Sequence, residues 1–211
     1  MKLRRTPDND SEREENPEQG LHLPDDTTEA RQIQVERVLV LGVTTKTFTR
    51  DELAAAFEKF EATVDRAAQT RDWDPWVDQY SPDVTYVEHA MGTMHGRDEV
   101  RPWIWATMET FPGSYMTSFP SLWSVIDEST GRIICELDNP MRDPGDGTII
   151  SATNISILTY AGDGQWCRQE DIYNPLRFVR AGVAWCRKAA ELGTLDAEAE
   201  AFMKQYGGTK P

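Results

Sequence analysis

The spacing of apolar residues along the chain changes near residue 120 from a helical period to a strand period. In the first half, Leu53, Phe57 and Phe60 recur at intervals of three and four residues, which places them on one face of a helix. Thr49-Arg50-Asp51-Glu52 forms a capping box directly before them, because the threonine side chain accepts the Glu52 amide and the glutamate reaches back. The pattern predicts a helix from this box to about residue 69.

Three further elements are predicted before residue 120. Asp74-Pro75 starts a short helix, with the aspartate as cap and the proline at the first helical position. Residues 84–89 alternate as a strand does, and residues 99–110 follow a helical period. Helices therefore dominate the first half of the domain.

The second half of the chain is rich in β-forming residues. Four β-rich runs cover residues 121–128, 132–138, 148–160 and 165–173, and they are separated by glycine-containing joints at 129–131, 143–147 and 161–164. Such joints are typical of hairpins, so the runs predict an antiparallel meander. Amphipathic helices are then expected at 176–192 and 196–206. This order predicts an α+β fold in which a curved, cone-shaped antiparallel sheet wraps around helices.

The charge pattern divides the chain into three parts. Residues 1–30 contain nine acidic and four basic residues and few large aliphatic ones, too little apolar surface to offset the entropy of ordering. Residues 1–48 are therefore predicted to be an acidic, largely disordered arm. Residues 49–176 are expected to form the α+β domain, and residues 177–211 a C-terminal helical extension.

Composition excludes several classes of function. The formal net charge of -14 disfavours nucleic acid as a partner. No run of 18 apolar residues is present, so no membrane-spanning helix is expected. The three cysteines, Cys135, Cys167 and Cys186, have no C-x-x-C spacing, which indicates neither a zinc site nor a disulfide framework and favours a reduced, cytoplasmic setting. Neither a metal nor a cofactor is predicted.

A set of short motifs resembles the SnoaL-like family of the nuclear-transport-factor-2-like superfamily. The motifs are Arg71-Asp72-Trp73-Asp74, Tyr80-Ser81-Pro82-Asp83-Val84, Gly96-Arg97-Asp98-Glu99-Val100 and the late Gly164-Gln165-Trp166. They span about residues 50–175. The resemblance implies a fold shared by ketosteroid isomerases, polyketide cyclases, scytalone dehydratase, limonene-epoxide hydrolase and many non-catalytic members, with one pocket for a small hydrophobic molecule.

His89 is the first candidate for proton transfer. It ends the predicted strand at 84–89 on the face of Thr85 and Val87, and the resemblance places it where ketosteroid isomerases carry their aspartate base. An imidazole titrates near neutral pH and can take and return a proton. The alternative is a strand-end histidine that is exposed or bound to a carbonyl. Glu88 would point the other way, towards solvent, and Tyr86 into the core.

The later strands supply the other candidates. Asp171 could act as an acid or orient His89, and Tyr173 on the same strand face could donate to a carbonyl oxygen. Asn154 and Ser156 share one face of the longest run and could bind a ligand oxygen, as the resemblance to scytalone dehydratase also implies. Structural roles remain open for all four residues.

Two functions remain open at this stage. The first is a cofactor-independent lyase, cyclase or isomerase that moves protons on a small hydrophobic carbonyl compound, with Trp103 or Trp105 in the pocket or an interface. The second is a non-catalytic binding or assembly module of the same fold. A homodimer is expected in both, because the meander carries apolar residues such as Ile155 and Ile157 on one face and Leu158 on the other.

Overall fold

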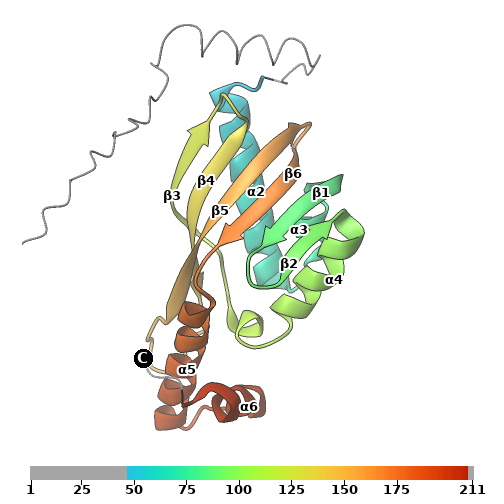
Figure 1. Ribbon diagram of the computed structural model, residues 1–211. Helices are drawn as coiled ribbons and strands as arrows, with labels where there is room; N and C mark the ends of the chain where they lie inside the picture. The colour runs from blue at the N-terminus through green and yellow to red at the C-terminus, as the bar shows by residue number, and fades with distance from the viewer. Residues whose placement is uncertain (1–46, 209–211) are drawn as a thin grey trace, which may run out of the picture. The chain divides into compact units, whose positions relative to one another are not determined.

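A computed structural model describes residues 47–208 of the chain (Figure 1). The predicted acidic arm, apart from its last two residues, lies outside this range. The elements are, in chain order, α2 (Arg50–Thr70), α3 (Asp74–Val77), β1 (Tyr80–Glu88), β2 (Gly92–His95), α4 (Arg97–Met108), the 3-10 helix η1 (Gly113–Tyr115), β3 (Ser121–Asp127), β4 (Arg132–Pro140), β5 (Ser151–Gly162), β6 (Gln165–Ile172), α5 (Pro175–Leu192) and α6 (Ala197–Tyr206).

Helix α2 begins at the predicted capping box. The side chain of Thr49 accepts a hydrogen bond from the Glu52 amide at 3.2 Å. Leu53, Phe57 and Phe60 are buried, and Figure 1 shows α2 lying across one face of the curved sheet. The apolar stripe read from the sequence is therefore the stripe that fills the inside of the sheet.

The six strands form one sheet in the order β2-β1-β6-β5-β4-β3. The hairpins β3–β4, β4–β5 and β5–β6 are antiparallel, as the meander pattern predicts. Strand β1, however, pairs with β6 in parallel, and β2 adds an edge strand that the sequence pattern did not predict. The predicted α+β fold with a curved sheet is confirmed, and the parallel pair joins the two halves of the domain.

The C-terminal helices have a hydrophobic cluster of their own. Trp185 and Cys186 of α5 and Ala199 of α6 are buried against Phe111 and Tyr115, from the loop that follows α4. In Figure 1, α5 and α6 lie beyond one end of the sheet. The helices predicted at 176–192 and 196–206 are present within one residue of their expected bounds.

The described helices also bear on membrane association. Within residues 47–208, no helix combines the length and the apolar character needed to cross a bilayer.

Candidate functional site

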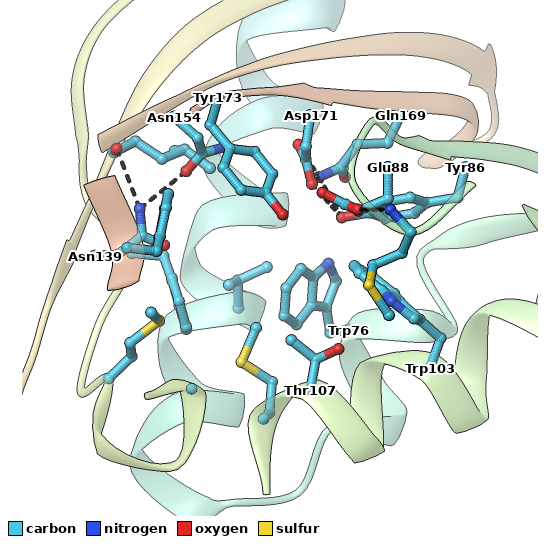
Figure 2. Close-up of a pocket in the computed structure, with 18 of the residues that line it drawn as sticks. Trp76, Tyr86, Glu88, Trp103, Thr107, Asn139, Asn154, Gln169, Asp171 and Tyr173 are labelled. Atoms are coloured by element: carbon cyan, nitrogen blue, oxygen red, sulfur yellow. Dashed lines mark hydrogen bonds between the residues drawn. The ribbon is translucent and has the colours of Figure 1, made fainter. Parts of the chain in front are cut away.

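A cavity of about 410 Å³ lies between α2, α4 and the inner face of the sheet. Its walls are rich in aromatic rings, which come from Phe57, Phe60, Trp76, Tyr86, Trp103, Phe111, Phe119, Tyr173 and Phe178. The polar side chains gather on the wall formed by the sheet, and Figure 2 shows them. An apolar chamber with a few polar groups on one wall is the usual form of a small-molecule site.

Strand register explains why the polar residues lie together. Four residues on neighbouring strands are cross-strand partners in succession: Cys135 on β4, Ser156 on β5, Asp171 on β6 and Glu88 on β1. Partners in register point to the same face of a sheet. The four side chains therefore form one row across the inner face.

Asp171 is the centre of a hydrogen-bond network. Its Oδ1 accepts from Ser156 Oγ at 2.5 Å and from Gln169 Nε2 at 3.0 Å, and its Oδ2 accepts from the Tyr86 hydroxyl at 2.5 Å. Burial raises the pKa of the Asp171 carboxyl, although these three donors act in the opposite direction. Donors hold the ionised form while burial penalises it, so the two effects oppose each other at this carboxyl.

A chain of amides extends the network along the sheet (Figure 2). Asn139 Nδ2 donates to Asn154 Oδ1 at 2.9 Å, and Asn154 Nδ2 donates to Ser156 Oγ at 2.9 Å. Because Ser156 donates in turn to Asp171, every bond in this chain points towards the carboxylate. The direction of the bonds fixes which way both amides face.

A second branch comes from the aromatic side of the cavity. Trp76 Nε1 donates to the Tyr80 hydroxyl at 2.9 Å, and Tyr80 donates to Gln169 Oε1 at 2.6 Å. Gln169 Nε2 also donates to the Tyr86 hydroxyl at 3.1 Å. Burial, and then the charge of Asp171, raise the pKa of the hydroxyls of Tyr80 and Tyr86 well above the usual range, so both hydroxyls stay protonated donors.

Glu88 is a second carboxylate on the same wall and is only 2% exposed. Its Oε2 accepts from the backbone amides of Ala90 and Met91, at 2.9 and 2.6 Å. Its Oε1 is buried and has no hydrogen-bond partner within 3.5 Å among the described residues. Burial raises the pKa of the nearby Tyr173 hydroxyl, and a hydrogen bond with Glu88 and the charge of that carboxylate raise it further.

The structure brings together most of the residues selected from the sequence. Asp171, Asn154, Tyr173 and Trp103 line the cavity, and Ser156 lies behind the wall, between Asn154 and Asp171. Figure 2 shows the Tyr173 hydroxyl pointing into the open space.

His89 is not part of this group. Its ring is about half exposed, and its Nε2 lies 2.9 Å from Oε1 of Glu170 on the opposite face of the sheet. The expectation that His89 faces the pocket, with Asp171 within reach, needs correction. On β1 the inner residues are Val84, Tyr86 and Glu88, so a residue one position further along points outwards.

Sequence reasoning missed Tyr86, Glu88, Gln169 and Asn139 as site residues. One signal was available for the first two. Val84 and Tyr86 make the more apolar of the two faces of β1, and the more apolar face is the one expected inside. No comparable signal marks Gln169 or Asn139, because their roles depend on cross-strand neighbours.

The comparisons with known proteins agree with this architecture. The sequence model of the SnoaL-like domain family matches residues 60–169, and the chain therefore belongs to the SnoaL-like family. This range contains the cavity wall from Glu61 to Gln169 and stops just before Asp171. No curated protein sequence matches the chain.

Three solved structures are similar to this chain. An epoxide hydrolase of the limonene-epoxide-hydrolase-like type from M. tuberculosis is 12% identical, with 73% of this chain and 99% of that chain covered and a TM-score of 0.51. A Bacillus subtilis protein provisionally assigned as an isomerase is 16% identical, with 62% and 92% covered and a TM-score of 0.49. A Sinorhizobium meliloti protein provisionally assigned as a polyketide cyclase is 19% identical, with 56% and 98% covered and a TM-score of 0.41. The first of these likenesses concerns the fold.

Proposed function

We propose that this SnoaL-like domain binds a small hydrophobic carbonyl compound in the cavity and moves a proton on it without a cofactor. The observation that carries the proposal is the Asp171 carboxylate, which lines an aromatic cavity, has its pKa raised by burial, and is held by Ser156, Tyr86 and Gln169. A carboxylate with a raised pKa is a suitable general base near neutral pH.

The chemistry follows from where the groups lie. Asp171 takes a proton from a carbon next to the carbonyl, and the electron pair of that C–H bond moves to the carbonyl oxygen. The Tyr173 hydroxyl, which points into the cavity (Figure 2), donates a hydrogen bond to the resulting oxyanion. Protonated Asp171 then returns the proton to another carbon in an isomerase, or to a leaving hydroxyl in a dehydratase.

This proposal moves the proton-transfer role from His89 to Asp171. His89 contacts Glu170 on the outer face, so it is not in position to reach a molecule in the cavity. Asn154 and Asn139 take a positioning role in the proposal, because their bonds orient Ser156 and through it Asp171.

The alternative is a binding module that performs no chemistry. The observation that favours it is the complete set of donors around Asp171, since both of its oxygens already accept hydrogen bonds. A carboxylate held in this way is a weaker base than a free one in the same apolar setting.

A deuterium-exchange experiment separates the two functions. The purified protein is screened by mass spectrometry for co-purifying carbonyl compounds, and the captured compound is then incubated in D₂O with the protein. We expect deuterium to enter the carbon next to the carbonyl, and Asp171→Asn to slow this entry by about 100- to 10,000-fold. Asn keeps the shape of the side chain, so the ligand should still bind. Binding without exchange in the wild type would establish the binding module instead.

We also propose a homodimer that forms through the outer face of the sheet. Trp123, Val125 and Ile172 are 44%, 54% and 43% exposed, and the register places them around Ile155 and Ile157. An apolar sheet face of this kind is stabilised when a second layer covers it. The cytoplasmic setting stays a prediction from cysteine spacing.

A further inference from the structure

The cavity has an unbalanced charge. Three carboxylates, those of Glu61, Glu88 and Asp171, are among its lining residues, and no lysine, arginine or histidine is. Arg71 donates to the carbonyl oxygens of Met108 and Met116, which line the cavity, but it does not line the cavity itself. A low-dielectric chamber with acids and no bases favours a positive guest.

Glu88 supplies a second observation, which is independent of the number of acids. Its side chain is almost fully buried, yet Oε1 has no hydrogen-bond partner within 3.5 Å among residues 47–208, and the donor that approaches the carboxylate, the Tyr173 hydroxyl, is neutral. A buried carboxylate oxygen without a donor is costly. The Glu88 charge also raises the pKa of Asp171, after burial as the main cause, so the two groups repel. A positively charged N–H donor at this wall would give Oε1 a hydrogen-bond partner, and its charge would offset the repulsion between Glu88 and Asp171.

The aromatic walls are suited to the same charge. The Tyr86 and Trp103 rings lie with their centroids 4.9 Å apart, and Trp76 lines the cavity with them. The faces of such rings attract a cation, most strongly where water is excluded. A metal ion fits less well, because the Asp171 oxygens are taken by donors and aromatic rings offer a hard cation no oxygen ligands.

We infer that the ligand of this cavity is a hydrophobic molecule with a protonated primary or secondary amine, whose nitrogen lies beside Glu88 and faces the Trp103 and Tyr86 rings. The inference deepens the proposed function and rests on its binding half, since the carbonyl compound then carries an amine as well. A quaternary ammonium is the poorer ligand, because it has no N–H to give to Glu88 Oε1.

Matched ligands test the inference by isothermal titration calorimetry on the full chain. The probes are benzylamine, phenethylamine and 4-phenylbutylamine, each beside the alcohol and the carboxylic acid of the same skeleton. We expect the best amine to bind at least about tenfold more tightly than its alcohol at pH 7, as a cation–π contact and a charged hydrogen bond together predict, and the acid to bind most weakly. An alcohol or acid that binds as tightly as its amine overturns the inference, and so does the absence of binding by every amine.

The variant Glu88→Gln locates the charge effect, with Glu58→Gln as a control at an exposed position of α2. We expect Glu88→Gln to reduce the preference for amine over alcohol, taken as the ratio of the two dissociation constants, by about tenfold, whereas the control keeps the preference. An unchanged preference in Glu88→Gln overturns the assignment. Failure here is distinguishable from failure of the proposed function, because a neutral ligand that binds and exchanges deuterium through Asp171 upholds the proton transfer without the amine.

Discussion

Replacement of Tyr86 by phenylalanine removes one hydroxyl from the Asp171 network and leaves the ring in place. The hydroxyl donates to Asp171 Oδ2 at 2.5 Å and accepts from Gln169 Nε2 at 3.1 Å. Gln169 loses the hydroxyl as an acceptor but keeps its contacts with Asp171 Oδ1 and Oδ2 at 3.0 and 3.3 Å, so the main loss falls on the carboxylate. Because no ring atom is deleted, the change creates almost no void.

The expected loss is that of a hydrogen bond to a charged group. Such bonds contribute about 1.5–3 kcal/mol, so Tyr86→Phe should lower the free energy of unfolding by about that amount at pH 8. For a domain of this size the same loss lowers Tm by about 3–12 °C. Urea unfolding followed by tryptophan fluorescence measures it, with Tyr206→Phe as the control, since the Tyr206 hydroxyl accepts only from the exposed Gln205 amide among described contacts.

The pH dependence gives the sharper test. Burial raises the pKa of Asp171 in the folded state, so stability falls as pH rises from the unfolded pKa through the folded one. The variant lacks a donor to the ionised form, and its folded pKa should lie higher still. The free energy of unfolding of the variant should therefore lie only slightly below that of the wild type at low pH, where Asp171 is protonated in the folded and the unfolded state. The difference should reach its full size above the pKa of Asp171 in the folded state. A deficit below about 0.5 kcal/mol at pH 8, or one equal at both ends of the range, would refute this account of the network.

Three further changes probe other parts of the domain. Asp196→Ala removes the carboxylate that caps α6 by accepting from Ala199 N at 3.1 Å and that also accepts from the Tyr115 hydroxyl and from Arg142. We expect a loss above the about 1 kcal/mol of a cap alone, because a hydrogen bond to a charged group adds about 1.5–3 kcal/mol, together with faster amide exchange in α6. A Cβ at Gly182 would lie 2.9 Å from Cε1 of Phe202, so Gly182→Val should cost about 1–3 kcal/mol by overpacking, and a thermal melt equal to wild type would contradict that contact. Ile157→Lys places a charge on the outer sheet face and should convert the proposed dimer to monomer in sedimentation velocity. A wild-type monomer at micromolar concentration would contradict the proposal of a dimer.

Local patterns predicted the elements of this fold because each of them depends on residues close in sequence. The capping box at Thr49 and Glu52 forms as expected, and the joints at 129–131 and 161–164 lie between antiparallel strands. Both depend on side chains no more than a few positions apart. The fold class follows from their order.

The site could be predicted only in part, because it depends on pairing between distant strands. Asp171 and Asn154 were found as polar residues within apolar strands, a local signal. The inner face of β1 was assigned wrongly. Neighbouring residues of a strand point to opposite faces, so an error of one position puts His89 in the cavity in place of Tyr86 and Glu88. The apolar pair Val84 and Tyr86 was the local signal for the inner face. The register that sets Glu88 beside Asp171 has no local signal, because it joins segments 83 positions apart.

The parallel pairing of β1 with β6 has a consequence for how the chain is made. Tyr86 leaves the ribosome long before Asp171, and at about 5–20 residues per second the 83 residues from Glu88 to Asp171 take about 4–17 s to synthesise. Throughout that interval the nascent β1 has β2 on one side and an unpaired edge on the other, which is the kind of edge that recruits foreign strands. Ligand recognition must wait for the same event, so a nascent chain that stops before β6 exposes its most aggregation-prone edge and has no finished binding site to stabilise it.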